Sequence, residues 1–359
     1  MSKPQVIVGV SGGVDSAVAL ALLKQQGYSV EGVFMTNWHA EPDDRYCTWR
    51  QDLADAQAVC KHLNVPFRQV DFADHYWNDV FQDCLRQLAL GNTPNPDVFC
   101  NSVIKFELFR HYAKELGAEM IATGHYARKT CYRGTYRLLK AKDDLKDQSY
   151  FLQRLNQTQL KDALFPLGNL TKNVVRQKAR ELGLTVSDKP DSTGICFIGE
   201  RKFREFLQHY LLTRPGEIVN QEGQVLGQHQ GVSFYTIGQR KGLGIGGKRD
   251  KLEAPWYVLK KDLTSNRLVV TQDPATLLKN ELVASDISWI GKAPKDFPVK
   301  CQAKIRYRQA DQECILLKAD SHPEQLLVKF KNDQRAVTPG QAIAFYQGEC
   351  CLGGGTIIY

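Results

Sequence analysis

A short stretch of small, hydroxyl and acidic residues, Ser11-Gly12-Gly13-Val14-Asp15-Ser16, has the composition of a phosphate-binding loop. Gly12 and Gly13 have no Cβ, so the backbone can adopt positive φ and come close to a ligand. The N–H groups at the start of a following helix would point at an anion, and two serine hydroxyls would add donors. Because a carboxylate repels phosphates unless a cation lies between them, Asp15 predicts a nearby Mg²⁺ ion.

The loop differs from two common nucleotide motifs. No Gly-Lys-Ser/Thr follows it, so the lysine that reaches the β and γ phosphates in a Walker A motif is missing. It also lacks the glycine spacing of a dinucleotide-binding turn, which argues against NAD. The alternative to a phosphate-binding loop is an ordinary strand-to-helix turn that contains glycines. Against it, an apolar run, Val6 to Val10, precedes the loop and a helical pattern, Ala17 to Leu23, follows it.

Two cysteines lie in segments that could hold a thiol in place. Cys100 lies in Thr93 to Asn101, a predicted loop with two stiffening prolines, just before a helix whose N-terminus would lower the thiol pKa. Asp97 is three residues earlier and could act as a general acid or base. Cys196 lies in a loop of small residues, Asp191 to Gly199. Either cysteine alone could be a buried structural thiol, but together they suggest sulfur transfer, with release through a disulfide.

Strand and helix patterns alternate around these residues. This alternation predicts an α/β fold with an N-terminal doubly wound parallel sheet. Ligands of such sheets bind beyond the carboxyl ends of the strands, where Gly9 to Ser16, Met35 and Thr123 to Tyr126 all fall. The expected strands are 6–10, 29–35, 67–72 and 119–122, and the expected helices are 17–23, 50–62, 75–90 and 103–116.

The composition changes after about residue 200. An amphipathic helix is expected at Arg201 to Leu212, followed by a Gly-rich basic segment, Gln239 to Arg249. Beyond about residue 280, short β-like runs predict a small all-β barrel. A strand over Val299 to Arg308 would place Lys300, Lys304, Arg306 and Arg308 on one face, which suits a phosphate backbone or a solvated outer face. The expected domains are 1–200, 201–275 and 276–359.

The composition as a whole sets broad limits. The 359 residues suffice for two or three domains, and the net charge of +8 gives a mild preference for polyanionic partners. The 10 cysteines contain no Cys-x-x-Cys, so no zinc site is expected. No apolar run reaches the roughly 18 residues of a membrane span. Without a signal peptide, a cytoplasmic protein with reduced thiols and no membrane partner is expected.

The loop resembles the SGGxDS loop of the PP-loop (adenine nucleotide alpha hydrolase-like) ATP pyrophosphatases, which cleave ATP between the α and β phosphates. The whole chain resembles the bacterial tRNA-specific 2-thiouridylases. Thr36 departs from that pattern, where Lys would follow the Met. The matching stretches are Gly9 to Ser16, Val33 to Met35, Thr93 to Asn101, Ile104 to Phe106, Ala122 to Ala127, Lys146 to Leu152, Asp191 to Gly199, Ile237 to Gly242, Arg306-Tyr307 and Pro339 to Gln341.

The resemblance implies an ATP-dependent reaction on the wobble uridine, position 34, of the tRNAs for Lys, Glu and Gln. ATP would adenylate the C2 oxygen of the base. Cys196 would carry a persulfide received from a cysteine desulfurase or sulfur-relay protein, and Asp97 would be the acid or base. Cys100 would free the sulfur and end in a disulfide with Cys196. Direct attack of the persulfide on C2 is the competing version, and both stay open.

By the same resemblance, most of the binding residues can be named. Asn95, Pro96 and Asp97 would contact a flipped uracil, in a tRNA bound through its anticodon stem-loop. The ATP-binding set is Gly9, Val10, Ser11, Gly12, Gly13, Val14, Asp15, Ser16, Met35 and Gly124. The remaining tRNA-binding set is His125, Lys146, Asp147, Gln148, Arg306, Tyr307 and Gln341, with a central tRNA-binding domain.

Two other functions compete with this one. A PP-loop synthetase that adenylates a small molecule, of the amidotransferase type, would need an ammonia source that no remaining segment suggests, and it would leave both loop cysteines idle. A catalytically silent RNA-binding protein on a decayed loop is a different class. Against it, the five residues that chemistry would need are all present: Asp15, Ser16, Asp97, Cys100 and Cys196.

Overall fold

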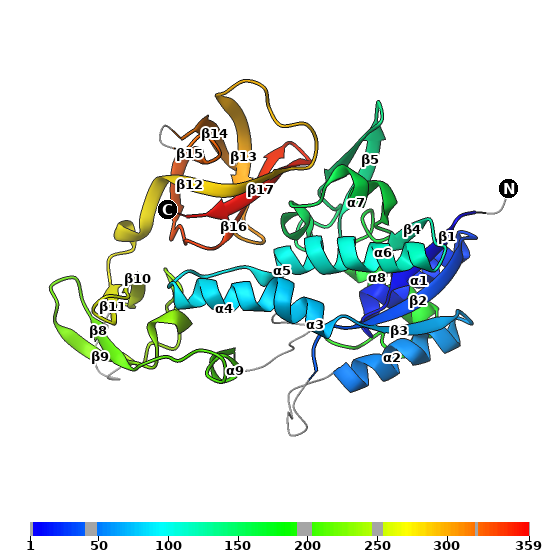
Figure 1. Ribbon diagram of the computed structural model, residues 1–359, viewed down its shortest axis with the longest axis horizontal. Coiled ribbons are helices and arrows are strands. Elements are labelled where there is room, and N and C mark those ends of the chain that lie inside the picture. Colours follow the sequence, from blue (N-terminus) through cyan, green and yellow to red (C-terminus); the bar gives the residue numbers. More distant parts are fainter. Residues whose placement is uncertain (1–2, 40–48, 192–202, 246–253, 320–321, 359) are drawn as a thin grey trace.

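The computed structural model describes residues 3–39, 49–191, 203–245, 254–319 and 322–358. The first of its three sheets has five parallel strands in the order β3-β2-β1-β4-β7 (Figure 1). The predicted doubly wound parallel sheet is therefore confirmed. The strands are β1 (Gln5–Gly9), β2 (Ser29–Thr36), β3 (Phe67–Asp71), β4 (Met120–Ala122) and β7 (Ala163–Leu164).

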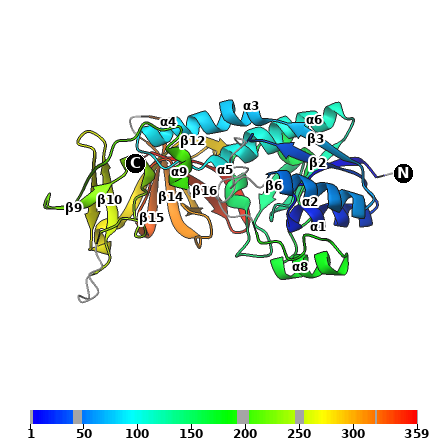
Figure 2. The ribbon, with the colours of Figure 1, turned by 90° about the horizontal axis from the view of Figure 1, so that it is seen from below.

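Helices cover both faces of this sheet because its central strand β1 is apolar and buried on both sides. Val6 and Val8 of β1 pack with α1 (Val14–Gln25), α2 (Trp49–His62) and α8 (Lys172–Glu181), whereas Ile7 packs with the opposite layer. Figure 2 shows α1, α2 and α8 below the strands and α3 and α6 above them. The opposite layer comprises α3 (Ala73–Tyr76), η1 (Trp77–Phe81), α4 (Gln82–Ala89), α5 (Pro96–Phe99), η2 (Cys100–Leu108) and α6 (Phe109–Glu115).

The predicted loop over Thr93 to Asn101 is wrong in its second half. Helix α5 begins at Pro96 and runs directly into η2, so Cys100 lies one turn inside a helix and not ahead of its first residue. Proline is favoured at the first helical position because its missing N–H would have had no partner there, and its φ suits the first turn. Pro96 thus starts the helix that carries Cys100, which has no exposed surface.

Residues after 200 form a second, four-stranded sheet in the order β10-β11-β8-β9. Its core holds Ile218, Val258 and Leu268. Ahead of it, α9 covers only Phe203–Leu207, shorter than the helix predicted to Leu212. The elements are β8 (Gly216–Val219), β9 (Val225–His229), η4 (Val232–Phe234), β10 (Tyr257–Asp262) and β11 (Arg267–Thr271).

The last part of the chain confirms the predicted all-β barrel. Six antiparallel strands follow the order β12-β15-β14-β13-β16-β17, and pairing of β12 with β17 closes the ring. Strand β17 also pairs with β6 of an earlier hairpin, so the sheet includes strands from far apart in the chain (Figure 1). The strands are β12 (Leu278–Trp289), β13 (Val299–Lys304), β14 (Gln312–Lys318), β15 (Leu326–Arg335), β16 (Ala342–Gln347), β17 (Cys350–Ile357), β5 (Arg128–Tyr132) and β6 (Thr135–Leu139).

The predicted strand over Val299 to Arg308, with four cations on one face, is wrong. Strand β13 ends at Lys304, and the chain then turns. The Lys304 ammonium is only 12% exposed and lies 3.6 Å from Asp147 and 3.7 Å from Asp311. It is internal because this outer face of the barrel packs against the N-terminal part of the chain, where carboxylates compensate its charge.

One helix, α7 (Gln157–Asp162), and two short helical turns, η3 (Ser149–Leu152) and η5 (Pro274–Leu277), complete the described part of the chain. No helix among the described residues is both long and apolar enough to span a membrane.

Candidate active site

The predicted phosphate-binding loop joins the end of β1 to the start of α1. The backbone N–H of Ser11 donates to Ser16 Oγ at 3.1 Å, and Ser16 Oγ donates to the Gly13 carbonyl at 3.2 Å. These bonds close the loop on itself. Its open N–H groups lie at the positive end of the α1 dipole, which is the arrangement that binds phosphate.

Two glycines of the predicted ATP set are required by close contacts. Gly12 has φ +74°, and a Cβ there would lie 2.2 Å from the backbone oxygen of Asp52. A Cβ on Gly124, just after β4, would lie 2.7 Å from the backbone nitrogen of Ser16. The ends of β1 and β4 therefore meet at the loop. Met35, at the end of β2, lies against Gly9, so the three predicted strand ends come together.

The carboxylate of Asp15 is compensated by a lysine. Lys172 Nζ lies 2.7 and 2.8 Å from the two carboxylate oxygens, and the Tyr126 hydroxyl donates to one of them at 2.8 Å. Lys172 is the first residue of α8 and is buried. Sequence reasoning missed Lys172 because 157 residues separate it from Asp15 and no motif marks it.

Asp191 extends this network toward the predicted Cys196 loop. Burial opposes its ionisation, but hydrogen bonds from Lys146 and Lys172 outweigh burial and lower the pKa of Asp191 to about 2. Arg176 adds a third cation at 2.9 Å. Asp191 is the last described residue before 192–202, so Cys196 and its predicted pairing with Cys100 lie outside the described residues.

A second lysine fixes the phosphate-binding loop from outside. Lys189 Nζ donates to the Gly12 carbonyl at 3.0 Å and to Asp52 at 2.7 Å, and it also pairs with Asp55. Asp52 and Asp55 lie one turn apart on α2. Lys189 thereby links the loop to α2. Like Lys172, it was not predicted from the sequence.

The predicted catalytic Asp97 lies in the first turn of α5, and Cys100 follows one turn later. The Asp97 charge reaches a neighbouring thiol. Burial, followed by the charges of Asp83 and Asp97, raises the pKa of Cys84 to about 12. Cys84 is therefore a core thiol. Asp97 and Cys100 share one helical segment, where the sequence predicted a loop.

Three of the predicted tRNA contacts, Asp147, Gln148 and His125, form hydrogen bonds within the chain. Asp147 is buried and accepts bonds from the Ala141 N–H at 3.0 Å and from Ser149 Oγ at 2.9 Å, and Gln148 accepts from the Tyr126 N–H. His125 Nδ1 lies 2.8 Å from Thr123 Oγ1. Burial and then Lys105 hold the pKa of His125 well below 6.5, so its imidazole is neutral at pH 7. These residues use their polar atoms internally.

Thr93 links the segment that carries Asn95 to the barrel and to the four-stranded sheet. Its N–H donates to the Pro339 carbonyl at 2.8 Å, and its own carbonyl accepts from Gln341 Nε2 at 2.8 Å. Lys261 of β10 reaches its hydroxyl at 3.3 Å. Gln341, a predicted tRNA contact, is therefore a support of the segment that carries Asn95.

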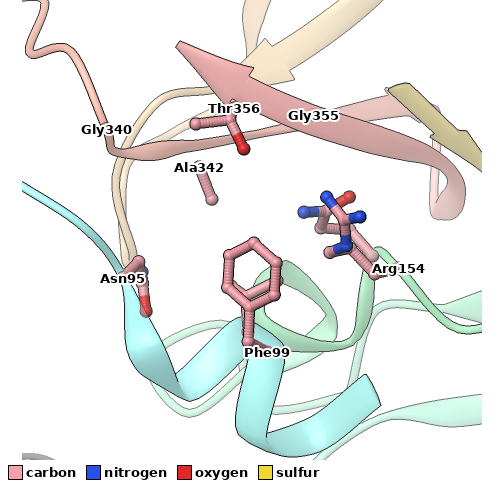
Figure 3. A pocket seen from close by; sticks show the side chains of 9 residues that line it. Asn95, Phe99, Arg154, Gly340, Ala342, Gly355 and Thr356 are labelled. Carbon is pink, nitrogen blue, oxygen red and sulfur yellow. The ribbon is translucent and has the colours of Figure 1, made fainter. Parts of the chain in front are cut away.

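A pocket opens beside Asn95, between α5 and the barrel (Figure 3). Asn95 and Phe99 line one side and Arg154 another, while Gly340, Ala342, Gly355 and Thr356 come from the barrel. Gln153 also lines it and is fully buried, with neither amide atom hydrogen-bonded within the described structure. An unpaired buried amide is costly, so this pocket offers a donor and an acceptor to a water or a polar ligand.

The described residues hold no cluster of three or more His, Cys, Asp or Glu side chains arranged for a metal. Asp15 offers one carboxylate beside the phosphate-binding loop. One carboxylate fits Mg²⁺ that is held mainly by nucleotide phosphates and water, since this ion usually keeps several waters.

Family models match three consecutive parts of the chain. One described as a tRNA methyl transferase HUP domain matches residues 4–200. A tRNA methyl transferase PRC-barrel domain matches residues 204–272, and an aminomethyltransferase beta-barrel domain matches residues 279–357.

Curated relatives match the whole chain. The tRNA-specific 2-thiouridylase MnmA of Francisella tularensis subsp. novicida (strain U112) is 50% identical over 363 residues, covering 100% of both chains. The protein of the same name from subsp. tularensis (strain SCHU S4 / Schu 4) matches equally. A solved 4-thiouridine synthetase–RNA complex with bound ATP is 16% identical, covers 57% of this chain and 50% of that one, and has a TM-score of 0.34. On its full-length identity to the curated relatives, the chain belongs to the tRNA-specific 2-thiouridylase family.

Proposed function

We propose that this chain is an ATP-dependent tRNA sulfurtransferase that converts the wobble uridine, position 34, of the tRNAs for Lys, Glu and Gln to 2-thiouridine. The observation that carries the proposal is the pairing of two features in one N-terminal fold. A closed phosphate-binding loop follows β1. Asp97 and Cys100 lie on one helical segment, and the pocket lies beside that segment. The full-length relatives that are 50% identical are named tRNA-specific 2-thiouridylases, which supports the thiolation of tRNA uridine.

The first step activates the base. The C2 oxygen of uracil is a poor leaving group, so its attack on the α phosphate of ATP, with loss of pyrophosphate, makes C2 reactive. The loop N–H groups would bind the triphosphate. Lys172 would offset its charge, and Mg²⁺ would bridge it near Asp15. AMP then leaves when sulfur replaces the oxygen.

The second step delivers sulfur. Cys196 would receive a sulfane sulfur from a cysteine desulfurase or relay protein and carry it as a persulfide. In one route, the Cys100 thiolate attacks the inner sulfur, forms the Cys100–Cys196 disulfide and releases HS⁻, which attacks C2. In the other, the outer persulfide sulfur attacks C2 directly and Cys100 then breaks the S–S bond. Both routes leave one disulfide for an external dithiol to reduce, and Asp97 would move the proton.

Recognition of the tRNA would involve all three parts of the chain, proposed as domains 1–200, 201–275 and 276–359. A stacked anticodon base must leave its neighbours to enter a pocket, which RNA loops allow. Asn95, Pro96 and Asp97 would contact the flipped uracil. The anticodon stem-loop would lie across the residues carried over from the resemblance, which are His125, Lys146 to Gln148, Arg306, Tyr307 and Gln341. We place the enzyme in the cytoplasm, where its tRNA substrate is found.

The test uses wild type, Cys100→Ser and Cys196→Ser with ATP, Mg²⁺, a persulfide donor and unmodified tRNA for Lys. Nucleosides are analysed by mass spectrometry and pyrophosphate is measured with and without tRNA. We expect 2-thiouridine from wild type, none from Cys196→Ser, and pyrophosphate release that depends on tRNA. Release stimulated by a small acceptor, with no thiolated nucleoside, would support the alternative small-molecule synthetase and overturn the proposal.

A further inference from the structure

Two arginines from different parts of the barrel lie near each other, one of them next to Tyr307 in the chain. Arg306 follows the end of β13, and Arg335 is the last residue of β15. Arg306 Nη2 donates to the carbonyl oxygen of Ala336 at 2.6 Å. Because Ala336 directly follows Arg335, this bond holds the Arg306 guanidinium close to the backbone that carries the second arginine.

The two positive charges have no acidic partner among the described residues. Within the described residues, no carboxylate lies within 4 Å of either guanidinium, whereas most other cations near the active site are paired. Burial and then the charge of Arg335 lower the pKa of Arg306. Because the Arg306 guanidinium is partly desolvated, a like charge beside it is unfavourable even though Arg335 is exposed, and an anion between them would remove that cost.

Both side chains are held in place before any ligand binds. The Arg335 guanidinium lies 4.7 Å from the centre of the Tyr257 ring, and Arg308 lies over the Tyr307 ring. Ala336 has φ +53° and Arg308 has φ +63°, conformations that residues with a Cβ rarely adopt. Such strained residues gather at ligand-binding positions, where the strain fixes the geometry in advance.

The arginine pair lies close to the segment that carries Asn95, which we propose contacts the target base. The Tyr307 ring packs 4.6 Å from that of Phe151, and the adjacent Tyr150 hydroxyl donates to the Ala342 carbonyl at 2.8 Å. Asn95 and Arg306 both favour ionisation of the Tyr150 hydroxyl, although its burial outweighs them and raises its pKa. Tyr150 therefore lies within electrostatic reach of Arg306 and beside Asn95, so an anion bound at the arginine pair would belong to a nucleotide close to the target base.

We propose that Arg306 and Arg335 together form a phosphodiester-binding site that holds the RNA backbone next to the target nucleotide. This rests on the proposed function. Arg335 is the new member, since the resemblance pointed only to Arg306 and Tyr307. A guanidinium suits the task because its planar set of N–H donors matches two phosphate oxygens at once. The other phosphate source, ATP, has its own place at the Ser11–Ser16 loop, so we assign the arginine pair to RNA.

The experiment compares wild type, Arg335→Gln, Arg335→Lys and the control Lys331→Gln. Lys331 lies on the same strand and pairs with Glu313 at 2.6 Å, so its variant removes the same charge away from the site. The Kd for unmodified tRNA and for its isolated anticodon stem-loop is measured between 50 and 200 mM salt, together with the KM for ATP. We expect Arg335→Gln to weaken both RNAs about 5- to 10-fold and to reduce the salt slope by about one.

We expect Arg335→Lys to retain part of the affinity and most of the salt slope, and Lys331→Gln to match wild type. An unchanged Kd and salt slope in Arg335→Gln would overturn the inference, even with wild type active in 2-thiouridine formation. So would an equal loss in Lys331→Gln, since the effect would then come from net charge alone. A raised KM for ATP with unchanged RNA affinity would assign the site to the nucleotide. Failure of wild type to make 2-thiouridine would instead count against the proposed function.

Discussion

The ammonium group of Lys261, on strand β10, lies 3.3 Å from the hydroxyl of Thr93 and donates to the Tyr235 carbonyl at 2.8 Å. No described carboxylate pairs with it, and burial lowers the pKa of Lys261 to about 8. Thr93 begins the segment that leads into Asn95 and Asp97. The four-stranded sheet therefore supports the segment that carries Asn95 through one partly buried cation.

Replacing Lys261 by Met should change how stability depends on pH. The folded chain releases this proton near pH 8 and the unfolded chain near 10.5, so the unfolded state binds more protons between these values. The wild-type free energy of unfolding should therefore gain up to about 3 kcal/mol from this group as pH rises from 8 to 10.5. Denaturant unfolding of wild type, Lys261→Met and the exposed control Lys260→Met measures it. Parallel pH curves for all three would contradict the partly buried cation.

Removing the Lys172 charge should disable ATP cleavage. Lys172→Met leaves the Asp15 carboxylate facing the triphosphate without its partner at 2.7 Å. We expect tRNA-dependent pyrophosphate release to fall about 100-fold, the scale seen when one preorganised electrostatic contact is lost. Lys178→Met, on the same helix α8, serves as the control. Wild-type release in Lys172→Met would show that Lys172 only supports the fold.

Gly12→Ala should be damaging for two separable reasons. The new methyl group would lie 2.2 Å from the Asp52 backbone oxygen, and the residue would also have to keep φ +74°. We expect a loss of about 1–3 kcal/mol in the free energy of unfolding and no ATP binding. Gly27→Ala is the matched control, because Gly27 has φ +83° with nothing within 4 Å of its added Cβ. Equal losses in both variants would mean that the contact with α2 is unimportant.

The imidazole of His125 should stay neutral well below pH 6.5. Its burial, and then the charge of Lys105, disfavour the protonated form. Because the unfolded chain takes up this proton near pH 6.5, the free energy of unfolding should fall as pH drops below 6.5, and less steeply in His125→Asn. NMR of the ring, assigned by comparison with that variant, checks the titration directly. A transition at pH 6.5 would show that the ring is accessible to protons in the folded state.

The parallel sheet and the barrel could be predicted because strand and helix periods are local properties of the sequence. The phosphate-binding loop could be found for the same reason, since its residues are contiguous. The segment from Pro96 to Asn101 was misjudged because proline is typical of both loops and first helical turns. Lys304 was misjudged because alternation predicts which face a side chain lies on, but not what packs against that face.

The salt-bridge network around Asp15 could not have been predicted from local patterns. Its members are far apart in the chain, and only the folded sheet brings Lys172, Tyr126 and Asp191 to one place. Lys261 and Thr93 are likewise 168 residues apart. A lysine pattern on a helix or strand is far more often solvated than buried, so nothing in the sequence separates these lysines from the rest.

The hairpin β5–β6 has a consequence for how the chain is made. Leu139 of β6 pairs with Cys350 of β17, 211 residues later. At about 5–20 residues per second, the ribosome needs about 10–40 s to supply the partner strand. During that interval one edge of the hairpin is unpaired. The eight-stranded sheet, which consists of the six barrel strands and the hairpin, cannot yet be completed. The final shape of the enzyme is therefore reached only after synthesis of the last strand, when the chain's C-terminal end closes onto a hairpin made much earlier.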